Sequence, residues 1–180
     1  LSPEQIVQAV QDSGLVGLGG AAFPSHVKMT PPQGKTLERI LINGCECEPY
    51  LTCDHRTMLE HPDKVLRGAQ ILGDHLGVGE IVVGIEKNKP DAIQALKDAA
   101  ATGRWGERID VHGVEVKYPQ GAEKLLIQAL FQLEVPNGKL PLDLEMVVNN
   151  VGTSAAIADW FDHGVPLVER VVTVSGPGVP

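Results

Sequence analysis

Short runs of apolar residues alternate along the chain with longer stretches in which apolar residues recur at helical spacing. An apolar run bounded by turn residues is typical of a buried strand. The pattern predicts strands over residues 39–43, 80–86, 109–116, 144–149 and 168–175. It predicts helices from Ser2 to Gly14, from near Thr52, and over residues 62–77, 90–101, 121–131 and 153–162. Because helices separate the strands, we expect an α/β fold with a mostly parallel sheet and helices on both faces.

A glycine-rich segment lies between the first helix and the first strand. It runs Gly-Leu-Gly-Gly-Ala-Ala-Phe-Pro over residues 17–24, and Lys28 follows it. Successive glycines let backbone N–H groups converge on an anion. A dinucleotide-binding fingerprint would follow a strand, whereas this segment follows a helix. We therefore expect a Rossmann-like fold with an atypical glycine-rich loop; a flexible loop without a ligand is the alternative.

Two further polar segments stand directly after predicted strands, where parallel sheets bind ligands. Residues 43–50 carry Glu46 and Glu48, which share a face if the segment is extended. Carboxylates at such a position can accept ribose hydroxyl groups; the alternative is an acidic loop that caps the next helix. At residues 149–153, two asparagines precede Thr153, which we expect to cap the last helix. A helix N-terminus there can bind an anion, and a simple Asx turn is the alternative.

A fourth segment, residues 118–123, joins another strand to a helix. Gly121 would let a ligand approach the backbone, and Glu123 falls in the first helical turn. The favourable effect of an acidic side chain on the helix dipole is the simpler explanation of Glu123. Because three of the four segments follow strands and the glycine-rich loop can reach them, we expect a single crevice that holds a cofactor.

Composition and charge exclude several classes of function. The 180-residue chain has a net charge of −8 and contains no cluster of Lys and Arg, which argues against a nucleic-acid-binding protein. No apolar run is long enough to span a membrane, and no signal peptide is visible. The three cysteines favour a reducing, cytoplasmic setting. Leu1 is not an initiator Met, so we expect an excised piece with an α/β domain over residues 1–165 and the start of a β-rich domain over residues 166–180.

A metal site is a rival interpretation of the cysteine-containing segment. Thiolate and imidazole groups suit zinc, and Cys45, Cys47, Cys53 and His55 lie close in sequence. Their spacing matches no common structural zinc pattern, so we expect no metal ligands. A non-catalytic docking module of a membrane complex is a further alternative.

In order and spacing, the segments at residues 17–24, 43–49, 118–124 and 149–153 resemble the FMN- and NADH-binding subunit family of respiratory complex I. The likeness is greater to the C subunit of Rnf-type complexes, which are ion-pumping ferredoxin:NAD oxidoreductases. Cobalamin reductases share the motifs and are the alternative. Four positions depart from the complex I pattern: Ala22 replaces a glycine, Cys45 an aspartate, and Ala122 and Gly152 glutamates. These departures favour the Rnf-type branch.

The resemblance implies a set of cofactor-binding residues and no catalytic side chain, because a flavin and a nicotinamide exchange the hydride themselves. It implies that Gly17, Gly19, Gly20, Ala21 and Ala22 wrap FMN through their backbones, that Lys28 and Asn43 contact it, and that Phe23 stacks on the dinucleotide. It implies that Glu46 and Glu48 form an acidic pair facing flavin and NADH, and that Tyr118, Gly121 and Glu123 belong to a second acidic segment, with Glu123 near the NADH ribose or amide. It assigns Asn149, Asn150 and Thr153 to the ribityl chain and phosphate.

The same resemblance implies a function and a setting. The expected activity is flavin-dependent electron transfer between NADH/NAD and downstream iron–sulfur carriers, in an enzyme peripheral to the cytoplasmic face of a bacterial membrane. The expected partners are the other subunits of the complex. No Cys-x-x-Cys-x-x-Cys run occurs in the chain, so the 4Fe-4S clusters are expected only beyond it.

Overall fold

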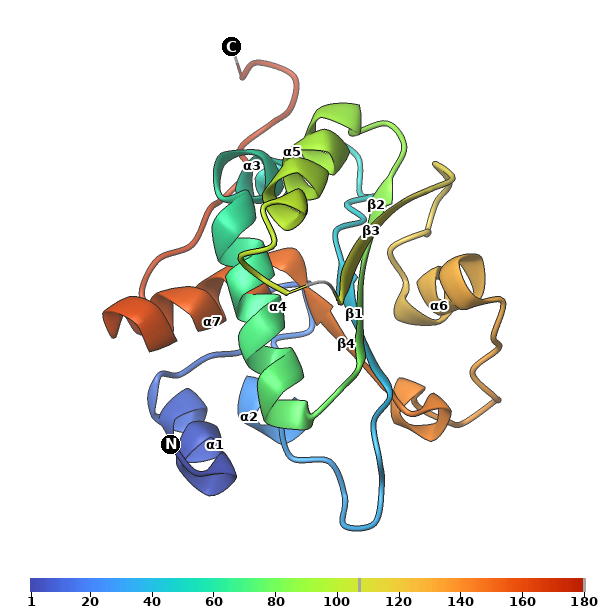
Figure 1. Ribbon diagram of the computed structural model, residues 1–180. Helices are drawn as coiled ribbons and strands as arrows, with labels where there is room; N and C mark the ends of the chain where they lie inside the picture. Colours follow the sequence, from blue (N-terminus) through green and yellow to red (C-terminus); the bar gives the residue numbers. More distant parts are fainter. Residues whose placement is uncertain (107, 180) are drawn as a thin grey trace.

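A four-stranded parallel sheet forms the centre of the molecule (Figure 1). The computed structural model describes residues 1–106 and 108–179. The strands follow the order β3-β2-β1-β4, and every neighbouring pair is parallel. Their bounds are Arg39–Asn43 for β1, Glu80–Glu86 for β2, Ile109–Val114 for β3 and Met146–Asn150 for β4. The predicted α/β class and parallel sheet are confirmed.

Most helices cover one face of this sheet. The apolar side chains of β1 and β2 that point to this face, such as Ile40 and Ile81, pack against Leu66 and Leu72 in one core cluster. The helices that contribute to this cluster or lead into it are α1 (Pro3–Asp12), α2 (Ser25–Lys28), α3 (Cys53–Glu60), α4 (Pro62–Leu76), α5 (Pro90–Ala101) and α7 (Val151–His163).

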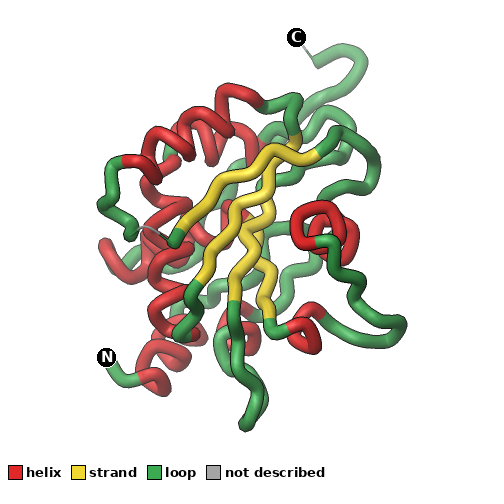
Figure 2. Tube along the Cα trace, turned by 45° about the vertical axis from the view of Figure 1, so that its right-hand side comes forward, coloured by secondary structure: helices red, strands yellow, loops and turns green. Residues whose placement is uncertain are grey.

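The other face is covered by one α-helix, α6 (Glu123–Phe131), as Figure 2 shows for the described residues. Its Leu126 and Ile127 pack against Leu41 and Val82, the strand residues whose side chains alternate to that side. A short 3-10 helix, η1 (Pro141–Leu144), leads into β4. The expectation of helices on both faces is therefore confirmed, with an unequal division between them.

Local sequence explains where several helices begin and end. Ser2 and Gln5 form the capping box at α1. Gly77 ends α4 with a φ of 67°, in the left-handed region that glycine adopts at low cost. At α7 the predicted cap is wrong: Asn150, not Thr153, accepts the first backbone N–H groups. The helix begins two residues earlier than predicted because Asn150, the last residue of β4, caps it directly.

The predicted strand over residues 168–175 is also wrong. The segment is extended but pairs with no strand among the described residues. Its valines, including Val168 and Val172, remain exposed. β-branched residues favour a strand only where a neighbour supplies hydrogen bonds and packing. The domain boundary near residue 166 stays a prediction.

The strand order creates a switch point between β1 and β4. The chain proceeds outward from β1 through β2 to β3, and then returns to the other side of β1. Ligands of open α/β sheets bind outside the carboxyl ends of the strands at such a point. Asn43 and Asn150, the last residues of β1 and β4, pair directly across it. Among the helices of the described chain, none is both long and apolar enough to cross a bilayer.

Candidate functional site

The glycine-rich loop is closed on itself and fastened to α7. The N–H of Gly17 donates to the carbonyl of Phe23 at 2.7 Å, and Val16 forms an isolated antiparallel bridge with Pro24. The N–H of Leu18 donates to Thr153 Oγ1 at 2.9 Å. Thr153, predicted as a helix cap, therefore anchors the loop to the first turn of α7.

The tip of this loop is open and needs unusual backbone angles. Gly20 has a φ of 108°, and a Cβ built on it would meet nothing within 4 Å. Ala22 has a φ of 50°, which explains why a glycine suits this position. A Cβ on Gly19 would lie 3.3 Å from Asn150 Cβ, so the loop passes close to the end of β4. Residues 19–23 are exposed, which leaves their backbone accessible to a ligand.

Lys28 connects the loop region to the sheet and to α6. Its Nζ donates to the carbonyl of Val148 at 2.7 Å and lies 5.9 Å from the centroid of the Phe23 ring. Burial lowers the pKa of Lys28, and the negative charge of Glu123 acts in the opposite direction. The predicted residues Phe23, Lys28 and Glu123 are thus brought into one neighbourhood.

Asn43 joins the segment after β1 to the segment before α6. Its Nδ2 donates to the carbonyl of Gly121 at 2.8 Å, and its Oδ1 accepts from the N–H of Cys45 at 3.0 Å. A Cβ on Gly121 would lie 2.9 Å from the carbonyl oxygen of Cys45. Glycine at position 121 therefore permits the close approach of the two segments.

The two glutamates of the acidic segment line the same hollow but differ in burial. Glu46 is buried, and its carboxylate accepts from the N–H of Asp54 at 2.9 Å and from the N–H of His55 at 3.2 Å. The alternative of an acidic loop that caps the next helix thus describes Glu46. Glu48 is exposed. Direct contact of either glutamate with a cofactor stays a prediction.

Glu46, Glu48 and Tyr118 line a hollow of about 470 Å³ at the carboxyl ends of β1, β2 and β3. Its floor contains the buried ion pair of Lys89 and Glu86, whose Nζ and Oε2 lie 2.8 Å apart. Glu86 Oε2 also accepts from the N–H of Glu46 at 3.2 Å. The hollow extends the predicted crevice toward β2 and β3, and Tyr118 is 75% exposed at its rim.

The two asparagines at the end of β4 have different surroundings. Asn149 is buried opposite Ile42. Asn150 Oδ1 accepts from the N–H of Gly152 at 2.8 Å, and its Nδ2 donates to Asp54 Oδ2 at 2.6 Å. Desolvation by burial raises the pKa of Asp54 to about 6, while the hydrogen bond from Asn150 acts against this rise.

Sequence reasoning missed Asp54, Gln120 and Arg170. Gln120 is fully buried, and neither its Oε1 nor its Nε2 has a partner, although it lies inside the Tyr118–Glu123 segment. Arg170 donates to the carbonyl of Leu18 at 2.9 Å from the C-terminal segment. Gln120 lies inside a motif and Asp54 stands two residues after Thr52, which could have drawn attention to them, whereas no sequence signal marks Arg170.

Among the described residues, the possible metal-ligand atoms that lie together belong to Glu46, Cys53 and Asp54, a different set from the rival zinc site. Cys45 is buried with its Sγ 3.8 Å from the carbonyl oxygen of Gly84, and burial raises its pKa to about 12. Cys53 donates to Glu46 Oε1 at 3.2 Å, and burial raises its pKa to about 11. Ligand atoms of Glu46, Cys53 and Asp54 lie within 4.8 Å of one another. Hydrogen bonds among them and to α3 and Asn150 account for this cluster, and both raised pKa values oppose thiolate formation.

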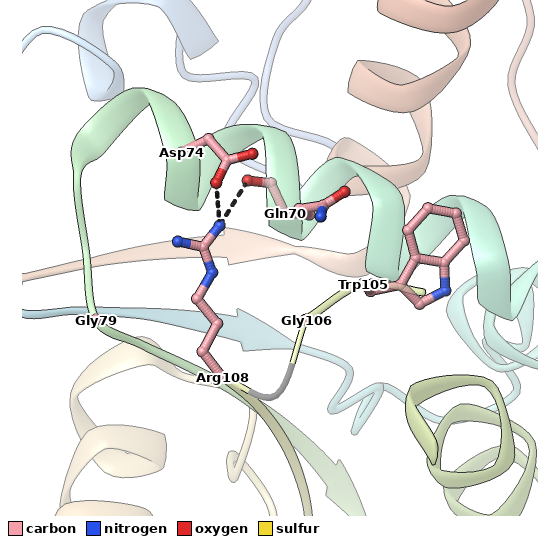
Figure 3. Close-up of a pocket in the computed structure, with 6 residues that line it drawn as sticks. All are labelled: Gln70, Asp74, Gly79, Trp105, Gly106 and Arg108. Atoms are coloured by element: carbon pink, nitrogen blue, oxygen red, sulfur yellow. Dashed lines mark hydrogen bonds and ion pairs between the residues drawn. The ribbon is translucent and has the colours of Figure 1, made fainter. Parts of the chain in front are cut away.

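A larger hollow, of about 580 Å³, lies at the opposite edge of the sheet (Figure 3). Gln70 and Asp74 of α4 face Arg108, which precedes β3, and Gly79 precedes β2. This is the edge at which the strands begin, so it is not where a parallel sheet binds its ligand.

The geometry defines a doubly wound α/β domain in which four loop segments meet at the carboxyl ends of the strands, with a hollow beside the ends of β1, β2 and β3. The chain matches the model of the Nuo51 FMN-binding domain over residues 10–159, and it belongs to this family. The resemblance that the four motifs indicated is therefore confirmed.

Individual relatives point to one branch of the family. Over 99% of its length the chain is 49% identical to the C subunit of the proton-translocating ferredoxin:NAD(+) oxidoreductase complex of Clostridium ljungdahlii. It is 44% identical, again over 99% of its length, to the C subunit of the Na(+)-translocating ferredoxin:NAD(+) oxidoreductase complex of Acetobacterium woodii. The chain spans only 38% and 40% of the length of these two relatives.

Solved structures support the same fold. The NAD+-reducing [NiFe]-hydrogenase in its air-oxidized state superposes with a TM-score of 0.72 and 26% identity, covering 90% of this chain and 31% of that chain. The same enzyme in its H2-reduced state gives a TM-score of 0.69 and 25% identity over the same fractions.

Proposed function

We propose that this chain is the flavin-binding part of an Rnf-type C subunit, in which FMN mediates electron transfer between NADH/NAD and iron–sulfur carriers. The observation that carries the proposal is the convergence of four separate segments on the β1–β4 switch point, with an open glycine loop above it. The family match and the names of the relatives support it.

The residues present fit a flavin nucleotide. The exposed backbone around Gly20 offers N–H groups with no side chain in the way. The ammonium group of Lys28 donates one hydrogen bond to the carbonyl of Val148 and has two further N–H donors for a ligand. The buried Gln120, beside Gly121, has an amide donor and an amide acceptor without partners. Bound FMN would supply the exchange between hydride chemistry and single-electron transfer.

The chain's own side chains then orient the substrates. We propose that Phe23 stacks on the nicotinamide dinucleotide and that Glu48 and Glu123 face its ribose hydroxyls. Carboxylates at these positions repel a 2′-phosphate, so NADH is preferred over NADPH. In the whole complex we place this domain on the cytoplasmic face of the membrane, in contact with other subunits and with 4Fe-4S clusters beyond residue 180.

A titration of the purified chain with FMN tests the proposal. We expect quenching of flavin fluorescence with a single saturable phase, and anaerobic bleaching of the bound flavin by NADH. Glu48→Gln and Glu123→Gln should weaken NADH several-fold more than FMN, because the two carboxylates are proposed to contact only the dinucleotide. A chain that leaves FMN fluorescence unchanged overturns the proposal, and equal bleaching by NADPH overturns the role of the carboxylates.

Cobalamin reductase activity is the alternative that the shared motifs leave open. It keeps the same flavin site and changes only the electron acceptor. Reduction of a corrinoid by the NADH-treated flavoprotein, faster than reduction of a ferredoxin, would favour it.

A further inference from the structure

Asp54 lies between the acidic segment and the first turn of α7. Nothing in its sequence context assigns it a role in the site. It lies in the first turn of α3, which Glu46 caps, and its Oδ2 accepts from Asn150 Nδ2 at 2.6 Å. Asn150 in turn caps α7 through Oδ1, which accepts from the N–H groups of Gly152 and Thr153 at 2.8 and 3.4 Å. One carboxylate therefore connects the acidic segment to the helix that anchors the glycine loop.

The side-chain amide of Asn150 has a donor, Nδ2, and an acceptor, Oδ1, and the carboxylate of Asp54 determines which of them faces α7. With Nδ2 toward the carboxylate, Oδ1 faces the N–H donors of α7. Rotation of the amide by 180° would set Oδ1 against the carboxylate oxygen and Nδ2 against N–H groups, so that both contacts become repulsive. The ionised carboxylate thus selects a single orientation.

The orientation of the Asn150 amide affects the glycine loop because the two lie close together. Asn150 Cβ would lie 3.3 Å from a Cβ on Gly19, and Thr153 Oγ1 accepts from the N–H of Leu18 at 2.9 Å. Because Asn150 Oδ1 accepts from the N–H groups of Gly152 and Thr153, a reoriented amide would leave these two donors in the first turn of α7 without their acceptor.

We propose that Asp54 is a positioning residue of the flavin site: its carboxylate fixes the amide of Asn150 and thereby the first turn of α7 and the glycine loop that this turn holds. The proposal rests on the flavin-binding function proposed above. Asp54 acts through Asn150, so no contact with the cofactor is required of it.

The proposal makes flavin binding dependent on pH. A protonated Asp54 offers one neutral acceptor in place of a charged one, and a charge-assisted hydrogen bond is about twice as strong as a neutral one. The ionisable groups that face Asp54 are Glu46, Glu48 and the thiol of Cys53 on the acidic side, and Arg170 on the basic side. Burial is the largest influence on its pKa, which is about 6, and places the change between about pH 5 and 7.

Two variants separate charge from hydrogen bonding. Asp54→Asn keeps an acceptor for Asn150 but cannot ionise, whereas Asp54→Leu removes the acceptor. We expect Asp54→Asn to bind FMN within about threefold of the unmodified chain at about pH 7.5, and Asp54→Leu to bind about tenfold more weakly. Asp91→Asn is the matched control, since Asp91 also lies in a first helical turn at this edge and pairs with His55, away from Asn150.

The decisive measurement is the dissociation constant of FMN between about pH 5 and pH 8. The phosphate of FMN titrates in this range for every variant. The ratio of the FMN dissociation constants of Asp54→Asn and the unmodified chain therefore reports the contribution of Asp54 alone. We expect this ratio to change by up to about threefold with a midpoint near pH 6, and the Asp91→Asn ratio to stay constant. A ratio independent of pH, or unchanged affinity in Asp54→Leu, overturns the positioning role.

A spectroscopic signal tests the link without the cofactor. The Asn150 side-chain ¹⁵N–H signals, assigned by their loss in Asn150→Ser, should titrate with a midpoint near pH 6 in the flavin-free chain and stay constant in Asp54→Asn. If no variant binds FMN but this titration occurs, the proposed function fails while Asp54 still orients the amide; if FMN binds and the signals do not titrate, the inference fails alone.

Discussion

The two edges of the sheet each carry a hollow, but they are built differently. At the edge where strands begin, the polar side chains that line the 580 Å³ hollow pair with neighbours around it: Arg108 with Asp74 and the Gln70 carbonyl, Gln70 with Arg67, and Trp105 with Asp63. At the edge where strands end, the contacts join segments far apart in the sequence. Leu18 reaches Thr153, Lys28 reaches Val148, and Asn43 reaches Gly121.

Size therefore does not distinguish a site from a surface hollow in this molecule. The polar side chains that line the larger hollow are paired with neighbours. The smaller one lies at the end of the sheet that also carries an open glycine loop, a buried amide without partners and a carboxyl group whose pKa is raised to about 6. Unsatisfied or perturbed groups beside a cavity are the mark of a binding site.

The largest expected effect comes from breaking the loop at the strand-end edge. Gly20→Val places a β-branched side chain at a φ of 108° and fills the open space over the loop. We expect FMN affinity, measured by fluorescence titration, to fall by a factor of about 100 or more, because the N–H groups can no longer converge on the cofactor.

Gly103→Val is the matched control near the other edge. Gly103 also has a positive φ, of 69°, and also has nothing within 4 Å of its Cβ position. Backbone strain is therefore introduced in both variants, but only Gly20→Val should lose FMN. Equal losses of affinity in the two variants would show that general destabilisation, not the loop, is responsible.

The sequence predicts the fold well because its signals are local. Alternating apolar runs predict β1, β2 and the helices α4 and α5 to within a residue or so. The strand predicted over residues 168–175 fails because strand formation depends on a neighbour, which no local pattern encodes.

The site is predicted less completely for a related reason. Motif order brings the glycine loop, Asn43, Glu123 and Asn150 together, but it does not show which polar atoms are already used. Glu46 matches a cofactor motif and yet caps α3, whereas Asp54 resembles an ordinary helix-start residue and yet holds Asn150. Only three-dimensional neighbours decide between such roles.

Removing a charge should have opposite effects on stability at the two edges. The folded-state pKa of Asp54, about 6, lies above its ordinary 3.8, so the unfolded chain loses this proton first as pH rises. Stability therefore falls between about pH 4 and pH 6 and is level above it. Asp54→Asn should abolish this loss and stabilise the chain at about pH 7.5 by about 2 kcal/mol, allowing for a weaker bond to Asn150.

Asp74→Asn is the counterpart at the other edge. Asp74 is exposed and paired with Arg108, so its replacement should destabilise the chain by less than about 1 kcal/mol. Urea denaturation at about pH 7.5 and about pH 4.5 measures both variants. A stabilising effect of Asp54→Asn that persists undiminished at the lower pH would contradict the assigned ionisation.

The smallest expected effect concerns the strain that Ala22 stores in the loop. Its φ of 50° costs an alanine about 1 kcal/mol, which Ala22→Gly relieves while raising the entropy of the unfolded chain. We expect a net stabilisation of about 0.5 kcal/mol, and FMN affinity changed by less than about twofold, because the backbone angles stay the same. Gly77→Ala, at a φ of 67° near the opposite edge, should instead destabilise by about 1 kcal/mol. Thermal unfolding of the two variants, with and without FMN, measures both the stability and the FMN affinity. Destabilisation by Ala22→Gly would mean that the methyl group of Ala22 packs in the loop and does not strain it.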